Sequence, residues 1–169
     1  MKKIAILIVL IIAPIITNAQ SFFDTLEDMD GVNLVVVTKD AFEMISKFKN
    51  AQVNDNEAIK VFQMIQELNE LKVFSTDNGA AATKMDGMIS SFIKTRNLTE
   101  LMRVKDKNSR VKIYVKATEN KDYVSEVLMF MKGDQKNAEN KLKATLVSLT
   151  GSIDINKMSE LADTFATGK

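Results

Sequence analysis

Carboxylates, lysines and methionines are the side chains of this sequence that could carry chemistry, because histidine, cysteine and tryptophan are all absent. Without histidine and cysteine, the commonest general base, metal ligand and reactive nucleophile are missing. This composition excludes zinc sites built on those ligands, Ser-His-Asp triads and Cys-His dyads. We therefore expect a protein that is not an enzyme and that uses no metal and no cofactor.

Paired carboxylates are the main route to acid–base chemistry that the composition leaves open. Asp24 shares a helix face with Glu27 or Asp28, and Asp30 follows closely. Such a group would suit a calcium-type oxygen site or an acid–base pair. The competing interpretation, a solvated helix face, is the one we prefer, since no loop has calcium-binding spacing. Asp55 and Glu57 are interpreted in the same way.

Methionine is the one residue type in excess, with ten in the chain. Met85, Met88 and Phe92 fall on one stripe of a predicted helix, and Met129 and Met131 fall on one face of a predicted strand. Flexible thioether side chains suit adaptable apolar pockets. The five residues are therefore candidates for the lining of a cavity that holds an apolar small ligand, and plain core packing is the interpretation we prefer.

Two surface patterns indicate interaction or modification. Lys112, Tyr114 and Lys116 alternate along a predicted strand and form a basic and aromatic strip. This strip is a candidate surface for a partner or an acidic glycan, and an ordinary solvent face of the sheet is the interpretation we prefer. Asp24-Thr25-Leu26 resembles the short acceptor used for O-glycosylation of exported proteins, which makes Thr25 a candidate modification site.

The start of the chain, over 1–19, has the three parts of a cleavable signal peptide. Lys2 and Lys3 precede an unbroken apolar run over 4–16, and Thr17-Asn18-Ala19 precedes a predicted cut that leaves Gln20 as the new N-terminus. The run is shorter than the roughly 20 residues of a membrane-spanning helix, and no cysteine follows it to carry a lipid. We expect an exported, soluble protein, periplasmic or extracellular, with no membrane span after cleavage.

The charge balance excludes some partners. Loss of Lys2 and Lys3 leaves 21 basic and 22 acidic residues, a net charge of −1. This balance does not favour nucleic acid binding or a polybasic membrane patch. The remaining residues, 20–169, are enough for one domain with its own core, without disulfides.

Hydrophobic periodicity predicts the elements that position these residues. Helices are expected over 21–29, 41–49, 81–95 and 98–103, with Asp40 and Asn97 as N-caps of the second and fourth. Strands are expected over 32–38, 71–76, 110–118, 123–131 and 142–150. Gly151-Ser152 should break the last strand before a final helix capped by Asp154 or a neighbouring residue. Residues 57–67 are ambiguous between helix and strand.

Short polar connections join the last three strands, so these strands should form an antiparallel meander. The predicted fold class is α+β: a single domain with a mainly antiparallel sheet of four or five strands and helices packed mostly on one face. A parallel pairing near the start of the chain remains open.

Three segments carry a resemblance to a known family. They are 98–116 (LTELMRVKDKNSRVKIYVK), 124–130 (VSEVLMF) and 146–161 (LVSLTGSIDINKMSEL). With the leader ending at Ala19-Gln20, they resemble a family of small exported Bacteroidetes-type proteins catalogued as a domain of unknown function. The resemblance spans most of 21–165 and is strongest at 149–155. It implies export and a single α+β domain, and it brings no activity and no site residues.

Three functions remain open on these observations. The favoured one is a non-catalytic envelope protein that binds a protein partner. The first alternative is a small carrier or sensor for an apolar ligand held in the methionine-lined cavity. The second alternative, a hydrolase that uses only carboxylates, needs two acids from different elements to converge, and we rank it last.

Overall fold

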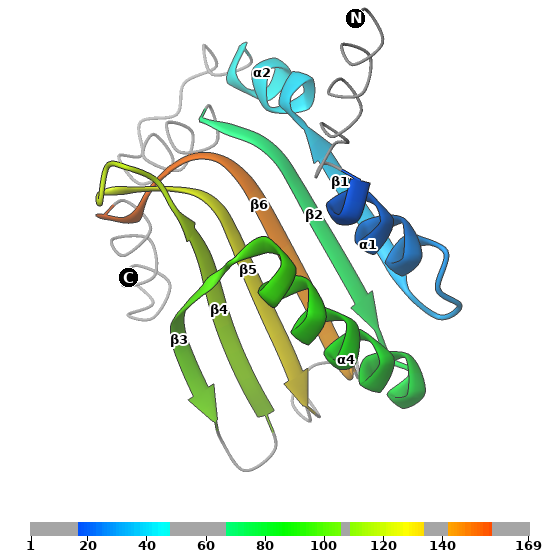
Figure 1. The fold of residues 1–169 in the computed structure, drawn as a ribbon. Coiled ribbons are helices and arrows are strands. Elements are labelled where there is room, and N and C mark those ends of the chain that lie inside the picture. Colours follow the sequence, from blue (N-terminus) through cyan, green and yellow to red (C-terminus); the bar gives the residue numbers. More distant parts are fainter. Residues whose placement is uncertain (1–16, 48–66, 106–108, 134–141, 157–169) are drawn as a thin grey trace, which may run out of the picture.

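Six strands form one antiparallel sheet in the order β1-β2-β6-β5-β4-β3 (Figure 1). The computed structural model describes residues 17–47, 67–105, 109–133 and 142–156. The strands are β1 (Asn33–Thr38), β2 (Leu68–Thr76), β3 (Thr99–Lys105), β4 (Ser109–Ala117), β5 (Tyr123–Gly133) and β6 (Ala144–Asp154). The helices are α1 (Thr17–Glu27), α2 (Lys39–Lys47) and α4 (Gly79–Arg96).

The predicted meander of β4, β5 and β6 is confirmed. Two details of the predicted sheet are wrong. It has six strands rather than four or five, because residues 99–105 form a strand and not a helix. All five strand pairings are antiparallel, so the parallel pairing left open near the start does not occur among the described strands.

Asn97 ends α4 instead of beginning another helix, which corrects the predicted cap. Its backbone is left-handed, with φ 53° and ψ 45°. The N–H of Leu98 donates to the carbonyl of Ile93 at 3.0 Å, the bond that closes a helix C-terminus when the preceding residue is left-handed. Asparagine tolerates this conformation better than most residues. The chain therefore leaves α4 abruptly and enters β3.

The beginnings of α2 and α4 are set by polar side chains. Asn78 Oδ1 accepts from the N–H groups of Ala80 and Ala81 at 2.8 and 3.2 Å, which caps α4. At α2 the acceptor is Thr38 Oγ1, 3.4 Å from the nitrogen of Ala41. Asp40 lies in the first turn of α2, so its predicted role as the N-cap is wrong.

Strand β6 continues through Gly151 to Asp154, so the predicted break at Gly151-Ser152 does not occur. Gly151 has φ +150° and lies opposite Leu68 of β2. A Cβ atom at this position would lie 2.3 Å from the carbonyl oxygen of Glu67. Glycine is needed here because the two backbones approach closely. Asp154 does accept from the N–H of Asn156, at 2.9 Å, as predicted for a cap.

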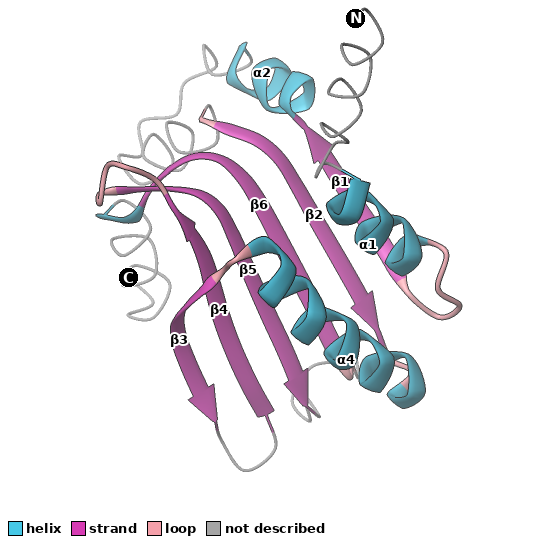
Figure 2. Ribbon diagram, viewed as in Figure 1, coloured by secondary structure: helices cyan, strands magenta, loops and turns pink. Residues whose placement is uncertain are grey.

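The sheet carries a hydrophobic cluster on each face. Helices α1 and α4 cover one face (Figure 2), and their side chains pack with the sheet in the main core. The buried members of the main core are Phe22, Leu26, Phe74, Ala82, Met85, Ile89, Phe92, Leu98, Tyr114, Leu128, Phe130, Ala144 and Leu146. On the other face a smaller cluster contains Phe42, Leu68, Val115, Val124, Val127 and Ile153. Because Phe42 belongs to α2, the helices are divided between the faces.

Some of the predicted features fall on residues that the structure does not describe. The features that lie outside the described residues are the apolar run at 4–16, Asp55, the ambiguous stretch from Glu57 up to residue 66, and the final helix beyond 156. Helix α1 begins at Thr17, ahead of the predicted mature N-terminus at Gln20. Among the described residues, none of the helices has the length and apolar character needed to cross a membrane.

Candidate functional site

The predicted strip of Lys112, Tyr114 and Lys116 lies on β4, on the face that α4 covers. Tyr114 is only 7% exposed and packs in the main core beside Leu98 and Leu128. Lys112 and Lys116 are half-buried. Tyr114 is therefore not the exposed aromatic residue that the sequence pattern indicated, and the accessible part of the strip consists of the two lysines.

Strand β3 adds charges beside this strip. Its pairing places Glu100 opposite Tyr114, Arg103 opposite Lys112 and Lys105 opposite Arg110. Residues directly opposite one another in an antiparallel pair share a face. We call the strand pair β3 and β4 the outer hairpin. Five cations therefore line the face of the outer hairpin that lies on the same side of the sheet as α4. They are Arg103, Lys105, Arg110, Lys112 and Lys116.

The opposite face of the outer hairpin is apolar. Met102 pairs with Ile113, and Val104 pairs with Val111. Val115, the next apolar residue of β4 on this face, is buried in the smaller cluster. The hairpin is thus amphipathic across its thickness, with a cationic face and an apolar face.

Glu100 is the single acid among these cations on the outer hairpin. The guanidinium of Arg103 donates a hydrogen bond to Glu100, which is the main reason why the pKa of Glu100 is lowered. Burial, and then the charge of Glu100, raise the pKa of Tyr114. At neutral pH Glu100 is therefore anionic and Tyr114 is neutral. Neither group is brought towards the pKa near 7 that a general base needs.

Strand β3 is exposed along its whole length. All seven of its residues are exposed, including Leu101 (54%), Met102 (46%) and Val104 (49%). A register shift between Glu100 and Met102 marks a bulge at Leu101. Edge strands in natural proteins are commonly protected by charges and bulges, and β3 has both. It also keeps large apolar side chains in contact with solvent.

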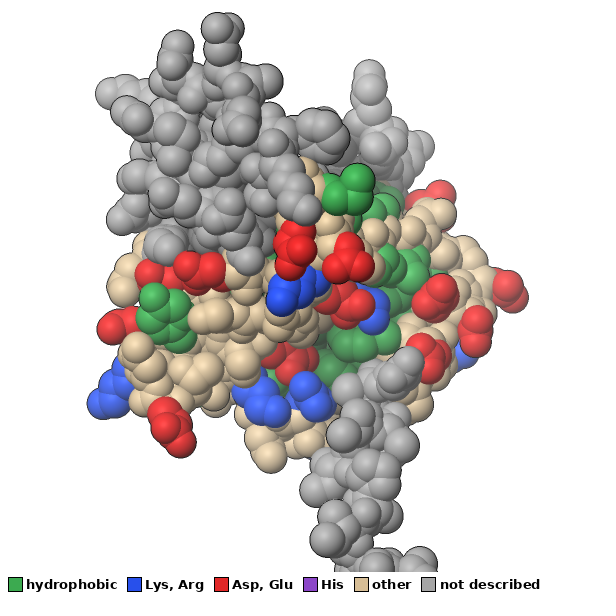
Figure 3. Space-filling model, turned by 90° about the horizontal axis from the view of Figure 1, so that it is seen from above, with side chains coloured by type: hydrophobic (Ala, Val, Ile, Leu, Met, Phe, Trp, Pro, Cys, Tyr) green, Lys and Arg blue, Asp and Glu red, His purple; other side chains and the backbone are tan. Residues whose placement is uncertain are grey.

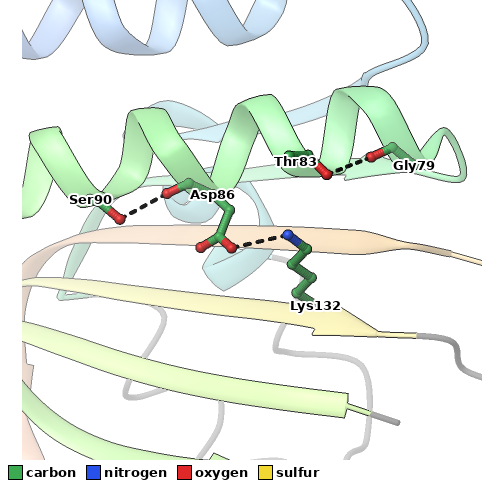
Figure 4. A network of polar contacts seen from close by, with 5 residues as sticks. All are labelled: Gly79, Thr83, Asp86, Ser90 and Lys132. Carbon is green, nitrogen blue, oxygen red and sulfur yellow. Dashed lines mark hydrogen bonds and ion pairs between the residues drawn. The ribbon is translucent and has the colours of Figure 1, made fainter.

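A contrasting arrangement occurs one strand further in, where an acidic side chain of α4 forms an ion pair with a lysine of β5 (Figure 4). Lys132 Nζ lies 3.0 Å from Asp86 Oδ2. The hydroxyls of Thr83 and Ser90 donate to the backbone carbonyls of Gly79 and Asp86 within α4. The cation of β5 on this face is therefore paired. Lys105, Arg110 and Lys116 of the outer hairpin form no ion pair with a described residue, although Lys116 lies opposite Glu126 in the strand register.

The end of the sheet near α2 does not concentrate one charge. Seen from this side, acidic and basic side chains lie next to one another around a hydrophobic area (Figure 3). The cationic face of the outer hairpin differs from this end of the sheet, because Arg103, Lys105, Arg110, Lys112 and Lys116 all carry the same sign.

The five residues predicted to line one cavity lie on two sides of the sheet. Met85 and Phe92 of α4 are buried in the main core, and Met88 packs against it. Met129 alternates with Leu128 and Phe130, which also belong to the main core, and it pairs with Ile113 on the apolar face. Met131 follows on the same side as Met129. The structure does not bring the α4 and β5 residues together.

The acidic residues at the start of the chain are solvent-exposed. Asp24 and Glu27 lie on α1, and Asp28 and Asp30 follow it. No three acidic side chains among the described residues gather closely enough to hold a metal ion. Thr25 is exposed on α1, where its hydroxyl donates to the carbonyl of Ser21 at 2.6 Å.

The exposed edge strand is the feature that sequence reasoning missed. Leu101 and Met102 are adjacent, and the bulge between Glu100 and Met102 breaks the two-residue alternation that marks a strand. Only Met102-Arg103-Val104-Lys105 alternates, and it is too short to outweigh the capping pattern of Asn97 and Glu100. Val104, a β-branched residue between two cations, was the available signal.

A family model described as a domain of unknown function (DUF4252) matches residues 23–161. The match covers most of the chain and includes all six strands. No curated protein and no solved structure matches the chain.

Proposed function

We propose that this chain, which belongs to the DUF4252 family of unknown function, is an exported, non-catalytic module. It binds a protein partner through the outer hairpin. The observation that carries this proposal is the exposure of β3. It contributes three of the six exposed large hydrophobic residues on the described surface. Exposed apolar side chains on an open sheet edge favour association with another chain.

Export is supported by the leader, with its basic start, its apolar run over 4–16 and its small residues before Gln20. A cut after Ala19 would remove only the start of α1 and keep Phe22 and Leu26, the helix residues buried in the main core. The fold described above would therefore survive the cleavage.

Intact-mass measurement of protein recovered from the cell envelope tests export. The expected mass is that of residues 20–169, or a larger one if Thr25 carries a glycan. A product that still contains residues 1–19 would contradict the proposed export.

Affinity recovery of native complexes from the cell envelope tests the proposed binding. The informative variant is Leu101→Asp/Val104→Asp, which places charges on β3. The matched control, Val35→Asp/Val36→Asp, makes the same change at exposed positions of β1, the strand at the other edge of the sheet. We expect the same partner with the wild-type chain and the control, and its loss with the β3 variant. Retention of the partner by a folded β3 variant would refute the proposal.

The two alternatives draw less support. An apolar carrier would have to use one face of the sheet alone, since Met85 and Met129 lie on opposite sides of it. A carboxylate-only hydrolase would need acids from different elements, whereas Asp24 and Glu27 are exposed on the same short helix.

A further inference from the structure

We infer that the partner binds by strand addition: an extended segment in which acidic and aliphatic side chains alternate pairs with β3 and becomes a seventh strand of the sheet. This inference rests on the function proposed above and deepens it by giving the chemistry of the partner. Backbone groups of β3 would supply the pairing, and the two faces of the outer hairpin would supply the selectivity.

None of the described strands occupies the outer edge of β3. Within the described part of the chain, β3 pairs with β4 alone and is the last strand of the sheet. An edge strand has N–H and C=O groups that point away from its neighbour. The bulge at Leu101 limits regular geometry to Met102–Lys105, and an added strand would pair there.

The side chains of this stretch alternate between the two faces. Arg103 and Lys105 continue the cationic face, and Met102 and Val104 continue the apolar face. An added strand extends both rows, because opposite residues share a face. A segment with acids at every second position would place them beside Arg103 and Lys105. The residues between the acids would then lie beside Met102 and Val104, where aliphatic side chains fit.

Three of the five cations form no ion pair within the described residues. Lys105, Arg110 and Lys116 form no ion pair with any residue that the structure describes. Arg103 pairs with Glu100, the one acid on this face of the outer hairpin. An acidic segment therefore gains attraction from cations that have no ion-pair partner among the described residues, while a basic segment is repelled.

A second copy of the chain fits the edge less well. Antiparallel pairing of residues 102–105 with the same residues of another copy would place Arg103 opposite Arg103 or opposite Lys105. Like charges directly opposite one another destabilise a strand pair. The charge pattern therefore favours a different chain of opposite charge.

Titration of the ¹⁵N-labelled chain over 20–169 with three short, capped peptides tests the inference, with backbone amide shifts as the readout. In the first peptide glutamate alternates with valine. The second has lysine in place of glutamate, and the third has the composition of the first with its glutamates contiguous. We expect the first peptide to bind and shift the amides of 102–105, and the other two to bind at least about tenfold more weakly.

A charge-reversal variant tests the role of the cations. Lys105→Glu/Arg110→Glu reverses two residues that face each other across the outer hairpin. The matched control, Lys84→Glu/Lys121→Glu, makes the same net change at exposed positions on α4 and in the turn before β5. The alternating peptide should lose at least about tenfold in affinity for the first variant and keep its affinity for the control.

Three results would overturn the inference. Equal binding of the contiguous peptide would reduce the interaction to charge attraction without strand pairing. A dimer whose β3 amides are protected would assign the edge to a second copy. No binding of the alternating peptide, while Leu101→Asp/Val104→Asp still abolishes envelope binding, would remove the acidic strand and leave the proposed function standing. If the alternating peptide does not bind and Leu101→Asp/Val104→Asp leaves envelope binding unchanged, both the acidic strand and the proposed function are refuted.

Discussion

Arg96, in the last turn of α4, donates from Nη2 to Glu126 Oε2 of β5 at 2.9 Å, and the Glu126 side chain is only 4% exposed. This ion pair joins the helix to the centre of the sheet beneath the point where the chain turns into β3. The pair is imperfect, because Arg96 Nε is buried and has no hydrogen-bond partner among the described residues.

Breaking this pair from one side should be costly. Arg96→Met removes the ion-pair partner of the buried Glu126 carboxylate and leaves Lys116, opposite it on β4, as the neighbouring cation, and we expect a loss of about 3 kcal/mol in the free energy of unfolding. Urea denaturation followed by circular dichroism measures it. Arg103→Met is the control, since the pair of Arg103 with Glu100 is exposed and solvent-screened, and its loss should change the stability far less than the loss of the Arg96 pair.

Replacing both partners separates the cost of an unpaired charge from the worth of the pair. Since desolvation of a buried pair offsets much of its attraction, Arg96→Met/Glu126→Leu should recover most of the stability lost in Arg96→Met. If the double variant is as unstable as Arg96→Met, the pair itself supplies the stability and the argument from desolvation is wrong.

Two glycines should respond to alanine in opposite directions. Gly151→Ala brings a Cβ atom to 2.3 Å from the carbonyl oxygen of Glu67 at φ +150°, and we expect a loss of about 3 kcal/mol. Gly87→Ala adds a Cβ to α4 with nothing within 4 Å, and should stabilise by about 0.5–1 kcal/mol. Thermal and urea unfolding of both variants check this. An unchanged stability for Gly151→Ala would mean that β2 and β6 separate easily at this point.

The same glycine shows where sequence reasoning reaches its limit. From the sequence, Gly151-Ser152 indicates a strand end, because glycine commonly interrupts regular structure. In the fold Gly151 lies within β6. Glycine is needed there because the backbone of Glu67 and Leu68, far away along the chain, lies too close for a Cβ atom. Local patterns predicted β1, β4 and β5 well, since the signals for these strands lie within the strands. A close approach between distant segments leaves no such local signal.

The edge strand illustrates a second limit. Asn97 fits the beginning of a helix as well as the end of one, and the sequence does not say on which side of it the helix lies. Once Asn97 ends α4, Thr99–Lys105 is free to pair with β4. The basic strip on β4 could be predicted from its alternation. The doubling of that strip by Arg103 and Lys105 depends on strand pairing, which the sequence of β3 does not specify.

The ionisation of Tyr114 should report on its packing in the main core. Burial and the nearby charge of Glu100 raise the pKa of Tyr114 above its ordinary value of 10.0. The folded chain therefore holds this proton more tightly than the unfolded chain. Its contribution to stability is complete below pH 10 and declines as the pH rises from 10 through the pKa of the folded state.

An absorbance titration of the phenolate band, compared between the wild-type chain and Tyr114→Phe, checks this prediction. The chain has two tyrosines, so the variant retains a single phenol. The signal lost in Tyr114→Phe should be the one that ionises above pH 10, and unfolding at alkaline pH should begin later in the variant. If the lost signal titrates at or below pH 10, the packing of Tyr114 in the main core is looser than described.

The two sets of methionines should behave as separate sites towards an apolar probe. Met85 is fully buried between α4 and the sheet, and Met129 is half-buried on the opposite face. A small apolar ligand at one site cannot touch the other, because the sheet lies between them. Titration of the methionine ¹³C-methyl signals with a medium-chain fatty acid should therefore shift at most one set, with Met85→Leu and Met129→Leu assigning the peaks. Concerted shifts of both signals at one affinity would restore the single cavity, and the carrier function would then outrank the interaction module.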